Sequence, residues 1–308
     1  MIGFIGLGAM GAVMAKRLVA AGRAVVVYDV RAEAVDALVA EGATAAKTPR
    51  EVADSAEIVL LSLPSPAVAV EVVTGRDGVL GGGQVQVVVD TSTIGGPTTG
   101  QLAAAAAAHG AGYVDAPVTG GVRGAVAGTL TVMMAGEDAA VDRVAPLLGI
   151  IGSNLVRVGR EPGQAQIAKL ANNLLSASAI LLSAEAVLMA VKAGVDPAVA
   201  MEIMSRGTGR NSAVEEKFPK FVMTRTFDSQ FRLDLLAKDL RLCLAAAAEM
   251  NVPMLAGRQV EQMFSLCESL SAPGADSMEM VRLLEEWSGV RMDASSWRQQ
   301  VAQMMEGH

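Results

Sequence analysis

The chain has 308 residues, 52% of them hydrophobic, and a formal net charge of -7. This length allows two domains, and the charge argues against a nucleic-acid partner because no basic stripe is available to neutralise phosphates. Cys243 and Cys267 are too far apart for a metal or redox motif, and His109 and His308 are the only histidines. We therefore expect a cytoplasmic protein with reduced thiols and no metal site.

The first predicted element is a short apolar strand that ends in a glycine-rich turn. Gly6, Gly8 and Gly11 in GFIGLGAMG have the spacing of a dinucleotide-binding turn. In such a turn the first glycine permits the tight bend, the second lets the backbone approach a pyrophosphate, and the third lets the next helix pack on the strand. A helix and a second apolar strand follow, and that strand ends in Asp29, at the separation expected for an acid that binds the ribose. This order predicts a nucleotide site, although a glycine motif alone would also suit a structural turn.

The choice of cofactor depends on Asp29. An ionised carboxylate accepts a hydrogen bond from a ribose 2′-hydroxyl and repels a 2′-phosphate, so NAD is favoured over NADP. Arg31 lies two residues later, where a guanidinium could bind such a phosphate. NADP therefore stays an alternative.

Strand and helix patterns alternate through the N-terminal half. Strands are expected near residues 2–5, 24–28, 58–63, 85–90, 113–116 and 129–136. This alternation predicts a doubly wound, mainly parallel α/β sheet of the Rossmann type. From about residue 163 the hydrophobic period becomes helical, with helices expected at 164–193, 197–205, 233–250, 254–267 and 277–289. We predict a nucleotide-binding domain over residues 1–160 and an all-helical domain over residues 161–308.

The most membrane-like stretch covers residues 174–191. Polar residues lie within it or beside it, among them Asn173, Glu185 and Lys192. Its length and polar content favour a long buried helix over a bilayer span, and we expect no membrane partner.

Three segments are rich in residues typical of functional sites. Thr119, Gly120 and Gly121 follow a predicted strand end, where backbone N–H groups can hold a carboxylate, although a flexible glycine loop fits equally well. Lys169, Asn172 and Asn173 share one helix face, and a lysine there could exchange a proton with a substrate hydroxyl if burial lowered its pKa. A lysine and asparagines at an interdomain seam are the alternative. In the third segment, Lys238 and Asp239 are interpreted as charges on a solvated helix face.

Together these segments resemble the β-hydroxyacid dehydrogenase family, which includes 3-hydroxyisobutyrate dehydrogenase and tartronate semialdehyde reductase. The matching motifs occur in the family's order: GFIGLGAMG, YDV, SLPSP, DTSTI, DAPVTGG with GTLTVMMAG, GQAQIAKLANN, AGVDP, GTGRNS and LLAKDLRL. The resemblance implies a Rossmann domain followed by an all-α domain. It also implies NAD-dependent oxidation of a small 3-hydroxy acid, or reduction of the matching semialdehyde, by a homodimer or homotetramer.

The resemblance assigns roles to individual residues. Lys169 would be the catalytic acid/base, and Asn173 would orient the substrate from the same helix. Thr119, Gly120 and Gly121 would bind the substrate carboxylate. The cofactor would be bound by Gly6, Leu7, Gly8, Ala9, Met10, Gly11, Asp29, Val30, Arg31, Leu63, Pro64, Thr93 and Lys238.

Some features leave alternatives open. Arg123 is not general to the family and could pair with a second anionic group of the substrate, although a surface arginine is the favoured interpretation. An imine reductase of the same fold would be expected to lack the lysine at position 169. A non-catalytic nucleotide-binding interaction protein would need neither Lys169 nor Asn173.

Overall fold

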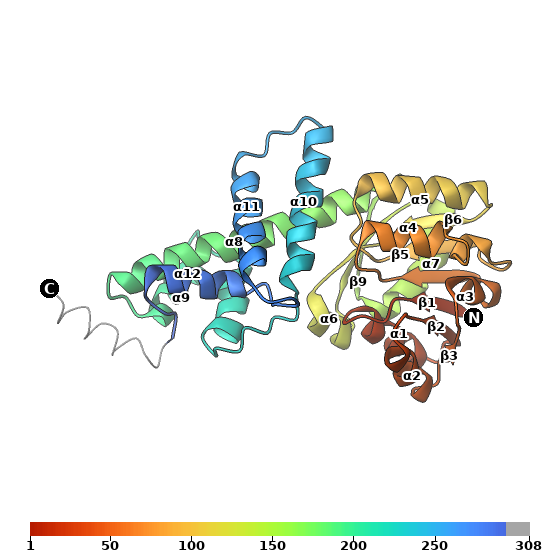
Figure 1. Ribbon diagram of the computed structural model, residues 1–308, viewed down its shortest axis with the longest axis horizontal. Helices are drawn as coiled ribbons and strands as arrows, with labels where there is room; N and C mark the ends of the chain where they lie inside the picture. Colours follow the sequence, from red (N-terminus) through yellow and green to blue (C-terminus); the bar gives the residue numbers. More distant parts are fainter. Residues whose placement is uncertain (294–308) are drawn as a thin grey trace. The chain divides into compact units, whose positions relative to one another are not determined.

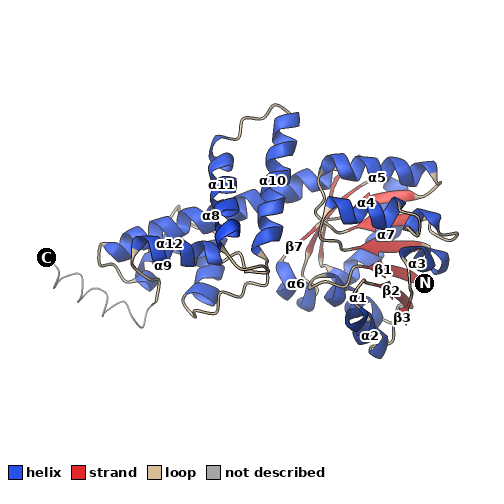
Figure 2. Ribbon diagram, viewed as in Figure 1, coloured by secondary structure: helices blue, strands red, loops and turns tan. Residues whose placement is uncertain are grey.

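The computed structural model describes residues 1–293, and the chain divides into two compact units, Met1–Ala171 and Asn172–His308. Within the first unit the strands form one nine-stranded sheet in the order β3-β2-β1-β4-β5-β6-β8-β7, with β9 paired to β8 (Figure 2). The strands are β1 (Ile2–Ile5), β2 (Val25–Tyr28), β3 (Thr44–Ala45), β4 (Ile58–Leu61), β5 (Val87–Asp90), β6 (Gly112–Asp115), β7 (Val118–Thr119), β8 (Thr131–Ala135) and β9 (Asn154–Gly159). Neighbours from β3 to β6 are parallel, whereas β8 runs antiparallel to β6 and β7. The mainly parallel Rossmann-type sheet is therefore confirmed.

Helices cover both faces of this sheet. Successive strand residues point to opposite faces, so neighbouring residues of one strand pack in different cores. Phe4 packs in a core with α1 (Gly11–Ala20), α2 (Ala32–Ala40), α6 (Gly121–Ala127) and α7 (Asp138–Ile151). Ile5, the next residue, packs in a second core with α3 (Pro49–Ser55), α4 (Pro66–Thr74) and α5 (Gly96–Ala108). The continuous apolar strands predicted from the sequence are thus buried on both sides, as parallel strands generally are.

The second unit is helical throughout its described part (Figure 1). Its elements are the continuation of α8 (Gln164–Lys192), then α9 (Pro197–Arg206), a π-helix (Ala213–Val222), α10 (Leu233–Glu249), α11 (Leu255–Leu270) and α12 (Glu279–Ser288). Phe218, Leu240 and Phe264 are fully buried in its core. All five predicted helices are present, and the π-helix is an element that the sequence did not predict. The boundary near residue 160 stays a prediction, since α8 itself runs from the first unit into the second.

Helix α8 is the one described helix that is long and apolar enough to cross a membrane by length and composition alone. Its residues Ala177, Leu181, Ala184 and Leu188 lie in the core of the second unit. Packing inside the unit therefore accounts for much of its apolar sequence, as expected for a core helix.

Candidate functional site

The glycine-rich turn connects β1 to α1. A Cβ atom added at Gly6, whose φ is 91°, would lie 2.3 Å from the carbonyl oxygen of Ser62, and one at Gly11 would lie 1.9 Å from the carbonyl oxygen of Gly6. Both positions therefore exclude a side chain. At Gly8 a Cβ would meet nothing within 4 Å, so the backbone there borders open space at the start of α1. A pyrophosphate can approach the backbone in such a turn and face the helix N-terminus.

Asp29 follows β2 and is tied to this turn. Its Oδ2 accepts a hydrogen bond from the backbone N of Leu7 at 2.6 Å, and its Oδ1 accepts from the backbone N and Nε of Arg31 at 2.9 and 3.1 Å. Arg31 in turn donates from Nη2 to the Leu7 carbonyl oxygen at 2.7 Å, while Val30 is exposed. Partial burial raises the pKa of Asp29, but the hydrogen bonds from Arg31 and Leu7 outweigh it and lower the pKa overall. Asp29 is therefore an ionised acceptor at neutral pH.

The loops after β4 and β5 lie at the carboxyl end of the sheet, where open α/β folds bind ligands. The backbone N of Leu63 donates to Ser92 Oγ at 2.8 Å, which ties the two loops together. Leu63 is buried, Pro64 is exposed and Thr93 is partly buried. Three of the residues proposed for the cofactor thus belong to a pair of linked loops.

A buried polar network anchors the start of α8 to the end of β6. Asp115 Oδ2 accepts from the backbone N of Gly163 and Gln166 at 3.0 and 3.1 Å, and its Oδ1 accepts from Gln166 Nε2 at 2.6 Å. Gln166 Oε1 accepts from the backbone N of Ile94 and Gly95 at 2.9 and 3.0 Å. The sequence analysis missed Asp115 and Gln166. The available indication was a second glutamine in the short segment GQAQ, just before an apolar helix.

Two further side chains extend the acidic part of this network. Burial raises the pKa of Asp115 to about 7; hydrogen bonds from Gln166 oppose this, and the charge of Asp90 adds to it. Asp90 Oδ2 accepts from the Tyr113 hydroxyl at 2.9 Å. Burial and the neighbouring Asp90 raise the pKa of Tyr113 well above its usual range, so its hydroxyl stays a donor.

The carboxylate-binding loop and the lysine predicted from the sequence both lie in the first unit. Thr119 ends β7, and Gly120 and Gly121 are exposed, with φ values of 125° and 64° that favour glycine. Lys169 lies on α8 one turn after Gln166 and is partly buried. Because Gln166 is fixed by the network, the backbone that carries Lys169 is fixed as well.

Asn173 lies one turn beyond Lys169 on α8 and is 4% exposed. Its Nδ2 donates to Asp239 Oδ2 on α10 at 2.7 Å, and Asp239 Oδ1 lies 3.1 Å from Lys238 Nζ. Asn172 is exposed and donates to Asn173 Oδ1 at 3.3 Å. Asp239 thus fixes the amide of Asn173 and at the same time pairs with a lysine.

The interpretation of Lys238 and Asp239 as charges on a solvated face is wrong. Asp239 is 4% exposed, and the side chain of Lys238 is 19% exposed. The sequence held a usable indication, because Leu236 and Cys243 stand three residues before and four residues after Asp239 and place it on the apolar face of α10.

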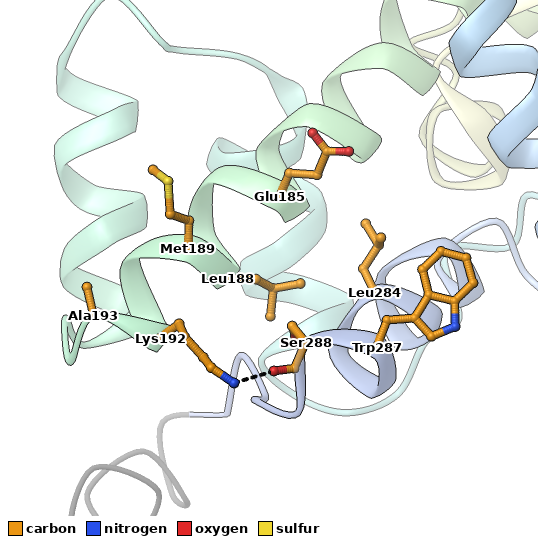
Figure 3. A pocket seen from close by; sticks show the side chains of 8 residues that line it. All are labelled: Glu185, Leu188, Met189, Lys192, Ala193, Leu284, Trp287 and Ser288. Atoms are coloured by element: carbon orange, nitrogen blue, oxygen red, sulfur yellow. Dashed lines mark hydrogen bonds between the residues drawn. The ribbon is translucent and has the colours of Figure 1, made fainter. Parts of the chain in front are cut away.

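A groove of about 660 Å³ lies between α8 and α12 (Figure 3). Leu188, Leu284 and Trp287 line it, and Lys192 Nζ donates to the Ser288 carbonyl oxygen at 2.7 Å. Glu185, the first α8 residue of the groove, is 16 residues beyond Lys169, which is about 24 Å along a helix. The groove is therefore separate from the proposed catalytic lysine.

Two family models match the chain. Residues 1–159 match the family model of the NAD binding domain of 6-phosphogluconate dehydrogenase. Residues 163–284 match the model described as NAD-binding of NADP-dependent 3-hydroxyisobutyrate dehydrogenase. Between them the two models cover most of the chain.

Individual relatives extend over nearly the whole chain. The 2-(hydroxymethyl)glutarate dehydrogenase of Eubacterium barkeri is 38% identical over 290 residues, which are 94% of this chain and 96% of that protein. The structure of Mycobacterium tuberculosis 3-hydroxyisobutyrate dehydrogenase with L-serine has a TM-score of 0.84 at 28% identity and covers 92% of this chain and 98% of its own. The imine reductase of Streptomyces aurantiacus, with a TM-score of 0.60 at 24% identity over 92% of this chain and 98% of its own, shows a shared fold only. The chain therefore belongs to the β-hydroxyacid dehydrogenase family and is an NAD(P)-dependent oxidoreductase that acts on a CH–OH group.

Proposed function

We propose that this enzyme oxidises the hydroxyl group of a small 3-hydroxy acid with NAD, and reduces the corresponding semialdehyde in reverse, with Lys169 as the acid/base. The position of Lys169 carries the proposal. It follows Gln166 by one turn on α8, and Gln166 is anchored to Asp115 and to the backbone of Ile94 and Gly95. A titratable amine is thus held on a fixed backbone at the start of a helix that is tied to the carboxyl end of the sheet.

The residues at the glycine turn fit a dinucleotide. Gly8 borders open space at the start of α1, and Asp29 offers an ionised carboxylate to a ribose hydroxyl. Leu63, Pro64 and Thr93 would line the cofactor in the two linked loops, with Lys238 contributing from α10. Bound NAD would supply the hydride acceptor.

The chain's own residues bind and orient the substrate. The Thr119 hydroxyl and the backbone N–H groups of Gly120 and Gly121 hold the carboxylate, and Asn173 hydrogen-bonds the reacting end. Lys169 Nζ takes the hydroxyl proton as the carbinol carbon loses its hydride, so the products are the semialdehyde, NADH and a protonated lysine. Acid/base catalysis by such a group contributes about 10²- to 10⁴-fold to a rate.

The test is NADH formation from a panel of 3-hydroxyisobutyrate, L-serine, glycerate and 2-(hydroxymethyl)glutarate by the wild type and by Lys169→Ala. We expect kcat to fall at least 100-fold in Lys169→Ala, while the Kd for NAD from fluorescence titration changes little. Lys192→Ala is the matched control, because Lys192 is on the same helix about 35 Å further along it. This variant should keep the wild-type kcat and the wild-type Kd for NAD. Loss of NAD binding with unchanged turnover at saturation would overturn the role given to Lys169.

The assembly is a separate proposal. We expect a homodimer or homotetramer formed through the helical domain, located in the cytoplasm. Sedimentation equilibrium of the purified protein measures its oligomeric state, and a monomer at micromolar concentration would contradict the proposed assembly.

A further inference from the structure

Asp115 binds the first turn of α8 from outside that helix. It ends β6, and its Oδ2 accepts from the backbone N of Gly163 and Gln166 at 3.0 and 3.1 Å. Its Oδ1 accepts from Gln166 Nε2 at 2.6 Å. The first N–H groups of a helix have no acceptor within the helix, and a negative charge beside them is favourable. The Asp115 carboxylate therefore takes the place of a capping residue for α8.

Each of these three hydrogen bonds requires Asp115 to be the acceptor. The amide of Gln166 cannot turn round, because its Oε1 accepts from the backbone N of Ile94 and Gly95 at 2.9 and 3.0 Å. An ionised carboxylate only accepts, whereas a protonated one carries a donor on one of its two oxygens. Hydrogen bonds to a charged acceptor are also roughly twice as strong as bonds between neutral groups. A proton on Asp115 therefore weakens its hold on α8.

The neighbours of Asp115 offer no positive charge to balance the carboxylate. Asp115 is fully buried, and so is Asp90, its partner in the register of β5 and β6. Tyr113, on β6 itself, donates its hydroxyl to Asp90 Oδ2 at 2.9 Å. The strand β8 places Ala135 opposite Asp115, and α8 contributes the uncharged Gln166. The charged side chain among these neighbours is thus another acid.

This setting opposes the charge that the hydrogen bonds require. Burial raises the pKa of Asp115 to about 7; the hydrogen bonds from Gln166 and Gly163 only partly oppose this increase, and the charge of Asp90 adds to it. A carboxyl group in water is fully ionised at neutral pH. Asp115 instead gains or loses its proton near neutral pH.

Lys169 lies on the part of α8 that Asp115 holds. It follows Gln166 by one turn and Gly163 by six residues, which is about 9 Å along a helix. It also belongs to the same compact unit as Asp115. Proton transfer requires hydrogen-bond distance between the base and the substrate, and a misplacement of about 1 Å can cost about 100-fold in rate. A first turn that is held less tightly would therefore slow the reaction without removing any group that touches the substrate.

We propose that Asp115 is a positioning residue for Lys169, and that protonation of Asp115 converts the enzyme to a slower form. This inference rests on the proposed function, because it takes Lys169 as the acid/base. The ionised carboxylate fixes the start of α8 and keeps Lys169 Nζ in place. The protonated form holds the same turn less tightly, so Nζ is in place less often.

The experiment follows the reduction of a semialdehyde with NADH, because Lys169 and Asp115 then respond to pH in opposite ways. Lys169 must be protonated to give its proton to the carbonyl oxygen, so its titration keeps or raises the rate as the pH falls. Asp115 must be ionised, so kcat should fall about tenfold between pH 7.5 and 5.5. This profile needs only the wild type, and it stands whether or not a variant folds.

Asp115→Asn removes the charge with little change of shape. The asparagine cannot be ionised, and it turns an NH₂ group toward donors. We expect kcat at pH 7.5 to fall about 10- to 100-fold, the effect of one hydrogen bond to a charged group, while the Kd for NAD changes little. The fall in kcat below pH 7 should disappear. Asp36→Asn, an exposed control on α2 in the same unit, should keep the wild-type rate and pH profile.

Urea unfolding distinguishes positioning from a purely structural role. The pKa of Asp115 is about 7 in the folded protein against an ordinary value of 3.8, so the folded state binds the proton more tightly. The stability that this proton contributes is therefore complete below about pH 4 and is lost as the pH rises through about 7. From pH 7.5 to 5.5 the wild type should become slower while it gains stability relative to Asp115→Asn. A purely structural anchor would lose rate and stability together.

Two results would overturn the role of Asp115: a wild-type reduction rate that does not fall below pH 7, or a fall that persists in Asp115→Asn. Failure of the proposed function looks different. In that case the wild type turns over none of the hydroxy acids, or Lys169→Ala is as fast as the wild type.

Discussion

Replacing Gln166 with methionine tests whether the buried amide fixes the start of α8. Methionine has a similar length but none of the polar atoms of glutamine. In the wild type, Oε1 accepts from the backbone N of Ile94 and Gly95, and Nε2 donates to the Ser92 carbonyl oxygen at 3.1 Å and to Asp115 at 2.6 Å. Gln166 is fully buried, so water cannot take the place of these bonds without a rearrangement.

The magnitude follows from the groups left without partners. Each buried polar group without a partner costs about 1–3 kcal/mol, so the two backbone donors alone predict a loss of about 2–6 kcal/mol. The apolar methionine side chain recovers about 1 kcal/mol of this by its burial. We expect the free energy of unfolding to fall by about 3 kcal/mol, which for a unit of this size lowers Tm by roughly 10 °C.

Urea unfolding and differential scanning calorimetry measure the effect. Gln164→Met is the matched control, because Gln164 is exposed on the same helix and its side-chain Oε1 accepts from the backbone N of Glu161 at 3.1 Å. The free energy of unfolding of Gln164→Met should fall by less than about 0.5 kcal/mol. In Gln166→Met, kcat should also fall, because Lys169 lies on the next turn. If the two variants differ by less than about 1 kcal/mol, the network does not anchor α8.

Two further substitutions test the cofactor site and the helical core. Asp29→Asn keeps an acceptor for the Leu7 amide but removes the negative charge. The ratio of kcat/KM with NADP to kcat/KM with NAD should therefore rise about tenfold. An unchanged ratio would show that Asp29 does not select the cofactor. Arg225→Met removes the two hydrogen bonds that Arg225 donates to the buried Glu285 carboxylate, at 2.7 and 2.8 Å, and leaves the one from the backbone N of Met292. It should destabilise the second unit by about 3–5 kcal/mol in urea unfolding, whereas Arg206→Met, an exposed control, should cost little.

The sequence predicted the large elements because each carries its own local pattern. The strands β1, β2 and β5 are short apolar runs that end at a glycine or an acid, and the structure begins and ends them within two residues of the predicted bounds. The strands β3 and β7 have only two residues each, too few for any periodicity. Every residue of β9 is exposed or partly exposed, so no apolar run marked it. The π-helix has an internal proline, Pro219, which predicts a helix break when the sequence is taken alone.

The same distinction between local patterns and long-range pairings applies to the candidate site. Gly6, Gly11 and Asp29 lie in one contiguous motif whose spacing is diagnostic, so the sequence was enough to propose them. Asp239 and Gln166 act through partners 66 and 51 residues away, Asn173 and Asp115. Pairings over such distances depend on the fold, and a single sequence gives no direct indication of them.

Helix α8 shows why both kinds of information are needed. Gln166, Lys169, Asn173 and Ser176 lie three or four residues apart on this helix, so the sequence alone places them in one row on one side of it. The partners come from different elements: Asp115 of β6 holds Gln166, Asp239 of α10 holds Asn173, and Lys217 of the π-helix holds Ser176. These partners lie 51, 66 and 41 residues away along the chain, so only the fold brings them to the helix.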